Sequence, residues 1–131
     1  MKNIGLIGCG NIAETYLRAQ EYFNNINFVA CADINLDAAK KTAEQYNIIP
    51  LSVDEILNDK NVDIILNLTI PQAHYEISKR ALEANKHVYC EKPMSVKFDD
   101  AKELLNLAKK NSLYIGNAPD TFLGGGGQLT R

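Results

Sequence analysis

The sequence has few of the residues from which proteins build metal centres and disulfide frameworks. It contains two histidines, His74 and His87, and three scattered cysteines, Cys9, Cys31 and Cys90, none of them in C-x-x-C spacing. An odd number of cysteines without that spacing is typical of reduced thiols in the cytosol, and the set matches no recognisable metal-ligand pattern. We therefore expect a cytoplasmic protein without a metal site, in which Cys9 packs rather than reacts, because the sequence suggests no resolving partner for it.

Long apolar runs and an excess of one charge are also missing. No run approaches the roughly 20 residues of a membrane-spanning helix, and the first apolar stretch, about four residues, is shorter than the ~7–15 of a signal peptide. The 14 basic and 16 acidic residues leave a net charge of −2, with the basic residues spread along the chain. This balance gives no electrostatic footprint for a nucleic acid or an anionic membrane. We expect neither as a partner.

Short apolar runs do alternate with helix-forming segments, in a chain of 131 residues that suffices for one domain. The apolar runs predict strands at residues 3–7, 27–32, 48–49, 62–68, 87–90 and 113–116. The segments between them predict helices at residues 11–23, 35–46, 52–58 and 71–84, and a fifth that starts near residue 99 with the apolar face Ala101, Leu104, Leu105 and Ala108. This alternation favours right-handed crossovers and an α/β fold, a doubly wound parallel sheet of six strands in the order 3-2-1-4-5-6.

Several local signals mark the ends of these elements. Asn35 suits a helix N-cap, and Ser52 with Glu55 forms a capping-box pattern. Pro50 favours an edge position for the third strand, because a missing donor is harmless there. Pro71 occupies a favoured first-turn position, and Asn85 suits a left-handed helix terminator.

A glycine-rich turn, Gly8-Cys9-Gly10-Asn11-Ile12-Ala13, stands where the first strand becomes the first helix. Gly8 permits a tight turn, Gly10 leaves room for a diphosphate near the backbone, and Ala13 is small enough for the helix to pack on its strand. The helix N-terminus then offers free N–H groups and a partial positive charge. The turn predicts dinucleotide binding, in which Asn11 and Ile12 take part, although it also occurs as a merely structural strand-to-helix turn.

Asp33 ends the second strand, about twenty residues after the glycine turn. A carboxylate at that point accepts hydrogen bonds from the hydroxyls of an adenosine ribose, and it repels the 2′-phosphate of NADP. No arginine follows it immediately. We therefore expect NAD as the cofactor in preference to NADP, the alternative being that Asp33 is an ordinary strand-end residue.

The predicted strand order reverses between the first and fourth strands, so a ligand is expected across the carboxyl ends of those strands. Loops that follow the fourth and fifth strands reach the same edge. The predicted cofactor-binding residues there are Thr69, Ile70, Pro71, His74, Glu91, Lys92 and Pro93.

Four segments together carry a family resemblance: the glycine turn, Thr69-Ile70-Pro71-Gln72-Ala73-His74, residues 86–93 with their Glu91-Lys92-Pro93 element, and residues 118–124. In these segments the chain resembles the glucose-fructose oxidoreductase, inositol dehydrogenase and rhizopine-catabolism (Gfo/Idh/MocA) family. The resemblance spans essentially the whole chain and implies an NAD(P)-dependent oxidoreductase acting on a sugar, a cyclitol or a related polyol. It also implies that the catalytic residue Lys92 lies beside the nicotinamide, with Glu91 and His74 in the same crevice.

Enzymes of that family carry a second α/β domain that forms most of the substrate pocket and often the dimer interface. The resemblance thus implies a dinucleotide-binding domain at residues 1–118 and the start of the junction to such a second domain at residues 119–131. We expect residues 1–131 alone to be catalytically incomplete, with the sugar-like substrate and a homo-oligomer belonging to the full enzyme. Apolar surface near Phe122 and Leu123 would then promote association.

Each candidate residue also has a simpler interpretation. Lys92 and Glu91 could be solvated surface charges, His74 a helix-end residue, and His87 is expected to be structural. In the enzymatic interpretation the Lys92 ammonium donates to the substrate oxygen and stabilises the charge developing on it; a cis Lys92–Pro93 bond is one way to aim this side chain. The alternative function is a non-catalytic dinucleotide sensor or interaction module with the same fold.

Overall fold

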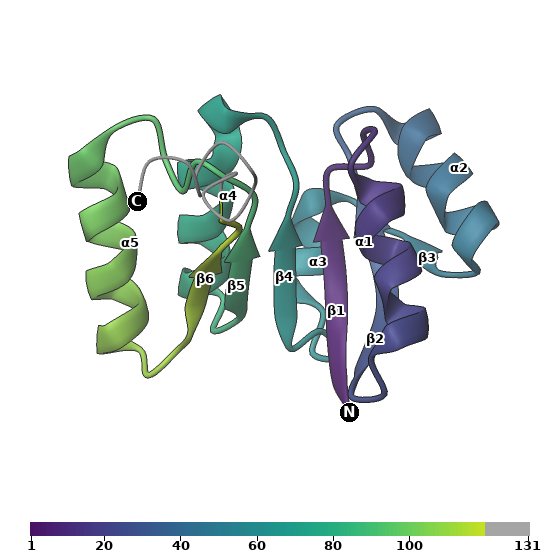
Figure 1. Ribbon diagram of the computed structural model, residues 1–131, viewed down its shortest axis with the longest axis horizontal. Coiled ribbons are helices and arrows are strands. Elements are labelled where there is room, and N and C mark those ends of the chain that lie inside the picture. Colours follow the sequence, from purple (N-terminus) through teal and green to yellow (C-terminus); the bar gives the residue numbers. More distant parts are fainter. Residues whose placement is uncertain (120–131) are drawn as a thin grey trace, which may run out of the picture.

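The computed structural model describes residues 1–119 of the chain. Within them, helices alternate with six parallel strands that form one sheet in the order β3-β2-β1-β4-β5-β6 (Figure 1). This confirms the predicted α/β fold and strand order. The elements are β1 (Lys2–Ile7), α1 (Ala13–Ala19), the 3-10 helix η1 (Gln20–Tyr22), β2 (Ile26–Ala32), α2 (Leu36–Tyr46), β3 (Ile49–Pro50), α3 (Val53–Asn58), β4 (Ile64–Asn67), α4 (Pro71–Glu83), β5 (His87–Cys90), α5 (Phe98–Lys110) and β6 (Ile115–Asn117).

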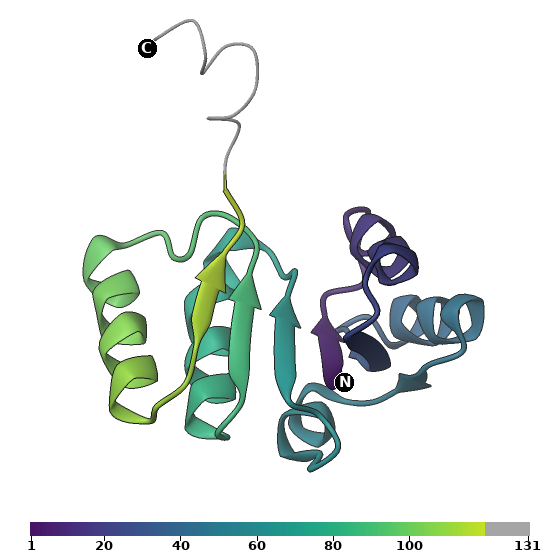
Figure 2. The ribbon, with the colours of Figure 1, turned by 60° about the horizontal axis from the view of Figure 1, so that its bottom comes forward.

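The carboxyl ends of the parallel strands share one edge of the sheet (Figure 2). β1 lies between β2 and β4, so the chain crosses from one half of the sheet to the other between β3 and β4. The loops that follow β1, β2, β4 and β5 therefore meet at this edge. In open sheets of this kind, ligands bind in the crevice at such a reversal point.

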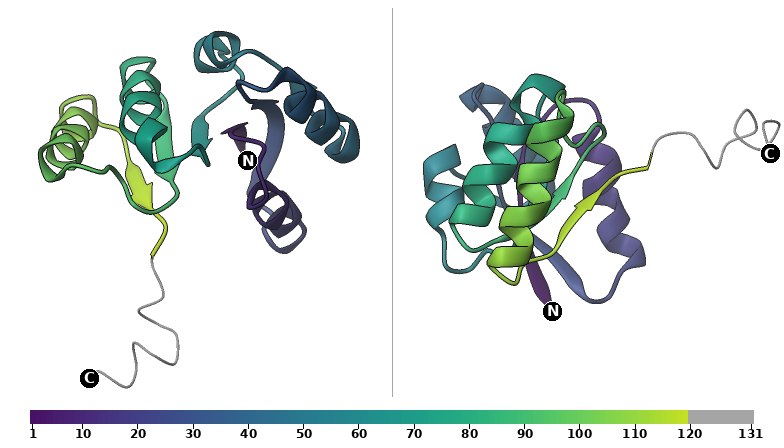
Figure 3. Two further views of the ribbon diagram at one scale, coloured as in Figure 1. Left: turned by 90° about the horizontal axis from the view of Figure 1, so that it is seen from above. Right: turned by 90° about the vertical axis from the view of Figure 1, so that its left-hand side faces the viewer.

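Each face of the sheet has its own hydrophobic core. α3, α4 and α5 cover one face, where Ile56, Leu82 and Leu104 pack on Ile65 and Val88. α1 and α2 cover the other face, with a core of Ile4, Leu6, Ala13, Leu17, Phe28, Cys31, Ala39, Ala43, Leu66 and Leu68. Seen from above, α1 lies on the opposite side of the sheet from α4 and α5 (Figure 3). Burial on both faces explains the nearly continuous apolar character of the central strands.

The local signals at the ends of the elements are confirmed. The Asn35 side chain accepts from the N–H groups of the first turn of α2, and Ser52 and Glu55 form a complete capping box. Asn85 follows α4 with φ 61°. Pro50 lies in β3, which is at the edge of the sheet.

Some predicted boundaries are wrong. The first helix was expected over residues 11–23, but Asn11 and Ile12 form a turn ahead of α1, and a 3-10 turn follows that helix. The expected apolar face of α5 includes Leu105, a residue that is 50 % exposed, whereas Leu104 and Ala108 are buried. Successive helical residues differ by about 100°, so a helix that turns Leu104 toward the sheet turns Leu105 toward solvent.

The predicted junction at residues 119–131 lies almost wholly outside the described residues, and so do Phe122 and Leu123. In the described part of the chain, none of the helices is both long and apolar enough to cross a membrane.

Candidate functional site

A groove of about 280 Å³ lies at the carboxyl edge of the sheet, between β1, β2 and β4. Five of the predicted cofactor-binding residues line it: Gly8, Gly10, Asp33, Thr69 and Ile70. The remaining lining is apolar and comes from the strand ends, α3, α4 and the loop after β2: Ile7, Ile34, Val53, Leu68, Ala73 and Ile77. An apolar groove with a few convergent polar groups is the usual form of a small-molecule site.

Gly8 and Gly10 serve the groove in different ways. Gly8 has φ +103°, and a Cβ built on it would lie 2.5 Å from the carbonyl oxygen of Leu68, so this turn packs tightly on the end of β4. A Cβ built on Gly10 meets nothing within 4 Å, so the backbone at Gly10 faces open space. The structure thus requires glycine at position 8 for packing, and it leaves the space at position 10 free for a ligand.

The later residues of the glycine turn, Asn11, Ile12 and Ala13, lie outside the lining of the groove. Ala13, the first residue of α1, is buried, as its small size predicts, while Asn11 and Ile12 are exposed in the turn. α1 has no side-chain cap at its N-terminus. The N–H of Ala13 donates to the carbonyl of Gly10 at 3.1 Å, and the positive end of the helix dipole at this terminus suits an anionic ligand.

Asp33 is held at the same edge by backbone groups of two loops. Its Oδ2 accepts from the N–H of Cys9 at 2.8 Å, and its Oδ1 accepts from the N–H of Asn35 at 2.7 Å. Each carboxylate oxygen has a further lone pair. The carboxylate is therefore fixed against the glycine turn and still able to accept from hydroxyl groups in the groove.

The loop after β4 is ordered by a buried amide, that of Asn67. Its Nδ2 donates to the carbonyl of His74 at 3.0 Å and to Ser78 Oγ at 2.9 Å, and its Oδ1 accepts from the Thr69 hydroxyl at 2.6 Å. Asn67 is fully buried, and its bonds to His74 and Ser78 are buried with it, whereas the bond to Thr69 is partly buried. This network fixes the loop that carries Thr69 and Ile70, with Pro71 exposed at the first position of α4.

His74 was expected to contact a cofactor or substrate, but the structure gives its ring protein partners instead. Only 1 % of the residue is exposed. Nδ1 lies 2.6 Å from the carbonyl oxygen of Pro93 and Nε2 lies 2.7 Å from that of Thr69. In this geometry His74 ties the loop after β4 to the loop after β5. A direct contact between His74 and the cofactor stays a prediction. Both ring nitrogens already lie within hydrogen-bond distance of protein carbonyl groups, which argues against it.

The loop after β5 presents Glu91, Lys92 and Pro93 beside β4. The N–H of Glu91 donates to the carbonyl of Asn67 at 3.0 Å, which joins the two strand ends. Lys92 is exposed, and its peptide bond to Pro93 is cis. None of the three residues lines the groove. They follow β5, which lies on the other side of β4 from β1 and β2.

Tyr16 is a residue of the site region that the sequence analysis missed. Its hydroxyl donates to Glu91 Oε1 at 2.8 Å, although the two residues are 75 positions apart. Burial and the neighbouring Glu91 raise the pKa of Tyr16. Asn67 was missed too, and its signal was a polar residue inside the most apolar run of the sequence.

The structure brings together two cysteines that the sequence left unrelated. Their contact lowers the pKa of the Cys9 thiol and, together with burial, raises that of Cys31. Cys9 Sγ donates to the carbonyl of Ala32 at 3.6 Å, and Cys31 Sγ to that of Ala39 at 3.3 Å. Both thiols belong to the core beside α1 and α2, where Cys9 packs as expected.

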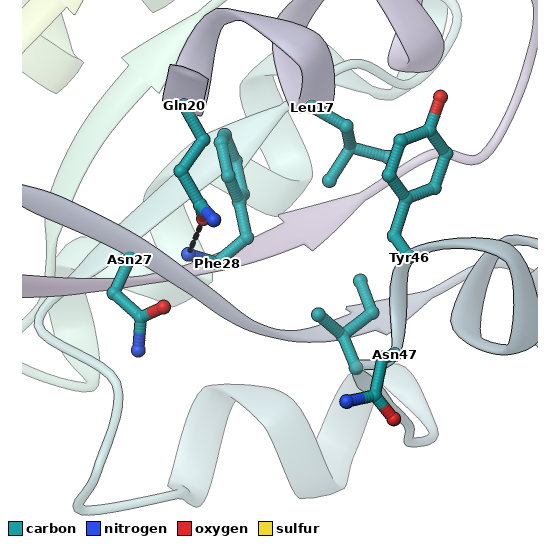
Figure 4. A pocket seen from close by; sticks show the side chains of 7 residues that line it. Leu17, Gln20, Asn27, Phe28, Tyr46 and Asn47 are labelled. Carbon is teal, nitrogen blue, oxygen red and sulfur yellow. Dashed lines mark hydrogen bonds between the residues drawn. The ribbon is translucent and has the colours of Figure 1, made fainter. Parts of the chain in front are cut away.

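A second hollow, of about 250 Å³, lies between α1, η1, the start of β2 and the end of α2 (Figure 4). Gln20, Asn27, Tyr46 and Asn47 contribute its polar groups, but Gln20 Oε1 already accepts from the N–H of Phe28 at 2.7 Å. It contains none of the predicted site residues and lies toward the amino end of β2, away from the strand carboxyl ends. Across residues 1–119 no group of three or more acidic, histidine or cysteine side chains could hold a metal ion.

The matching family model is the Gfo/Idh/MocA model, described as an oxidoreductase family with an NAD-binding Rossmann fold, and it covers residues 2–118. The chain belongs to the Gfo/Idh/MocA family. The groove of this family member is thus the candidate dinucleotide site of its NAD-binding Rossmann fold. The strand order, the glycine turn and the acidic residue at the end of β2 agree with that assignment.

Relatives of this family member include proteins with different names and different bound molecules. Inositol 2-dehydrogenase of Salmonella typhimurium is 30 % identical over 111 residues, which span 82 % of this chain and 33 % of that enzyme. The WlbA dehydrogenase of Chromobacterium violaceum, solved with NADH and UDP-GlcNAcA, has a TM-score of 0.88 and 25 % identity over 98 % of this chain and 38 % of its own. Biliverdin reductase of Synechocystis, solved with biliverdin and NADP+, has a TM-score of 0.89 and 27 % identity, and the match covers 96 % of this chain and 40 % of that protein.

The chain therefore spans about a third of the length of curated relatives such as the inositol dehydrogenase. The part that these enzymes share with this chain is the Rossmann domain. Solved relatives hold NADH in one case and NADP+ in the other, so the fold alone accommodates either cofactor.

Proposed function

We propose that this chain binds NAD(H) at the carboxyl edge of its sheet, as the cofactor-binding part of an oxidoreductase. The observation that carries the proposal is the pairing of the open space at Gly10 with the Asp33 carboxylate, which is fixed to the same turn through the N–H of Cys9. The diphosphate would bind at the start of α1, with contacts from Asn11 and Ile12, and the adenosine ribose at Asp33. Ile34, Val53 and Ile70 supply apolar surface for the adenine.

A preference for NAD over NADP follows from the charge of Asp33. The carboxylate receives two backbone N–H groups and has no basic side chain hydrogen-bonded to it within the described residues. A 2′-phosphate would lie against this negative charge and be repelled. We therefore expect NADH to bind more tightly than NADPH.

When bound, a nicotinamide supplies the hydride chemistry. The chain's own contribution would come from Lys92, whose ammonium can donate to a substrate oxygen and stabilise negative charge there. Glu91 and Pro93 flank this lysine, and the N–H of Lys92 donates to Glu91 Oε2 at 3.0 Å. We propose a sugar, a cyclitol or a related polyol as the substrate class, supported by relatives such as inositol 2-dehydrogenase.

Residues 1–118 would form the cofactor-binding domain, in agreement with the span of the family model. A partner domain after them, a homo-oligomer and a cytoplasmic location stay predictions of the sequence analysis. So does the expectation that residues 1–131 alone do not turn over a polyol.

Titration calorimetry with NADH on the wild-type chain and on Asp33→Ala tests the proposal. We expect the variant to bind NADH at least about tenfold more weakly, a loss of about 1.4 kcal/mol, and to discriminate less between NADH and NADPH. Asp63→Ala is the matched control, because Asp63 Oδ2 also accepts from a backbone N–H, that of Asn3 at 2.8 Å, and lies before β4 rather than at the groove. No heat with the wild type, or equal affinities for wild type and Asp33→Ala, would refute the proposal.

A further inference from the structure

The hydrogen bond between Tyr16 and Glu91 joins two parts of the site that the strand order keeps apart. Tyr16 lies on α1, which follows the two groove-lining glycines Gly8 and Gly10, and Glu91 follows β5, with β4 between β5 and β1. The hydroxyl donates to Glu91 Oε1 at 2.8 Å. The bond therefore reaches across the end of β4, over the sheet face that α1 covers.

Both partners of this bond are held in place. The Tyr16 ring packs edge-on against Tyr89, with 6.4 Å between the ring centroids and an interplanar angle of 61°. Glu91 Oε2 accepts from the N–H of Lys92 at 3.0 Å, and the Glu91 carbonyl accepts from Asn117 Nδ2 at 3.1 Å. Neither the phenol nor the carboxylate can move without breaking a further contact.

The direction of the bond is fixed by chemistry. A carboxylate only accepts, so the phenol must keep its proton. Burial and Glu91 raise the pKa of Tyr16, which means that the phenol remains a donor throughout the neutral range. The contact is thus a charge-assisted hydrogen bond, among the stronger kinds in proteins.

We propose that Tyr16 is a positioning residue, which holds the Glu91 carboxylate and, through it, the Lys92 backbone at a set distance from the start of α1. This rests on the proposed function, in which the diphosphate binds at α1 and the nicotinamide lies near Lys92. The Tyr16–Glu91 bond then aligns the two halves of the cofactor site. Tyr16 itself need not touch the cofactor.

Tyr16→Phe keeps the ring and its packing on Tyr89 and removes only the hydroxyl. Two ligands separate the effects: ADP-ribose carries the adenosine, the diphosphate and the second ribose, and NADH adds the nicotinamide. For Tyr16→Phe we expect an NADH affinity about fivefold lower or more, since bonds to charged groups are the stronger ones. We expect the ADP-ribose affinity of this variant to stay within about twofold of the wild-type affinity, because the lost hydroxyl does not contact the part of the site that would bind ADP-ribose.

Tyr75→Phe is a matched control. The Tyr75 hydroxyl donates to Glu103 Oε2 at 2.9 Å, the same type of bond, but it joins α4 to α5 away from the groove. Tyr75→Phe should bind NADH and ADP-ribose as the wild type does. A selective NADH loss in Tyr16→Phe alone supports positioning, because a general loss of stability would weaken both ligands.

Glu91→Gln and the double variant complete the experiment. If Tyr16 acts through Glu91, the double variant binds NADH no more weakly than the weaker single variant, whereas independent effects would multiply. Losses of NADH affinity that multiply in the double variant would overturn the positioning role alone. Unchanged NADH binding in Tyr16→Phe, with a wild type that binds both ligands, would do the same. A wild type that binds neither ligand would overturn the proposed function and this inference with it.

Discussion

The two halves of the candidate site are built in different ways. In the half formed by β1, α1 and β2, the backbone shapes the site: Gly8 packs on Leu68, and Asp33 accepts from the N–H groups of Cys9 and Asn35. In the half formed by β4, α4 and β5, side chains do this, through Asn67, His74 and the Tyr16–Glu91 bond.

This difference suits the parts of a dinucleotide that each half would meet. A diphosphate and a ribose are common to all such cofactors, and backbone N–H groups with one carboxylate suffice to bind them. The nicotinamide must be held with its reactive carbon against a substrate, which requires side chains at set positions. The first half is therefore rigid by backbone geometry, whereas the second depends on a network that single substitutions can loosen.

The largest effect is expected from Gly8→Ala in the backbone-built half. The added Cβ would lie 2.5 Å from the Leu68 carbonyl oxygen in a backbone conformation with φ +103°. Strain of this kind and the clash together should lower the free energy of unfolding by about 3 kcal/mol or more, measured by urea denaturation.

Gly10→Ala is the matched control for that substitution. Its Cβ would meet nothing within 4 Å, so its stability should change by no more than about 0.5 kcal/mol. Its ADP-ribose affinity should fall, because the methyl group enters the space assigned to the diphosphate. Equal stability losses for both variants would show that the two glycines do not differ as described.

A smaller effect is expected from Asn67→Ala in the side-chain-built half. The substitution leaves the Thr69 hydroxyl and Ser78 without their buried partner, and should cost about 2–3 kcal/mol of unfolding free energy. Denaturant titration measures it. Asn58→Ala, which removes an exposed bond from Nδ2 to the Asp54 carbonyl, should cost about 0.5 kcal/mol or less. A similar cost for both asparagines would mean that the buried network does not hold this half.

The smallest effect concerns pH. The pKa of Tyr16 is raised in the folded chain, so its contribution to stability is complete below the pKa of an unfolded tyrosine, about 10, and declines as the pH rises through the folded value. Above about pH 10 the wild type should therefore lose more stability with rising pH than Tyr16→Phe, which has no such group. Thermal melts at matched ionic strength measure the difference. Parallel pH profiles would indicate that the phenol is not held by Glu91.

Much of the backbone-built half could be predicted from the sequence. The glycine turn and Asp33 stand about twenty residues apart at the ends of adjacent strands, and this spacing alone predicted residues that line one groove. The capping signals at Asn35 and Ser52 also predicted the starts of α2 and α3, because a cap depends on residues within one turn of it.

The sequence by itself determined the alternation of strands and helices, their order and the turn at which a diphosphate would bind, since each rests on local pattern and on the handedness of crossovers. Only the tertiary structure decided the partners of Tyr16, Asn67 and His74. Those hydrogen bonds link residues up to 75 positions apart. The Tyr16–Glu91 bond exists because β4 alone separates β1 from β5 in the sheet, and the Asn67 and His74 bonds exist because α4 packs back on β4 and β5. These arrangements depend on the packing of whole elements, which local pattern does not specify.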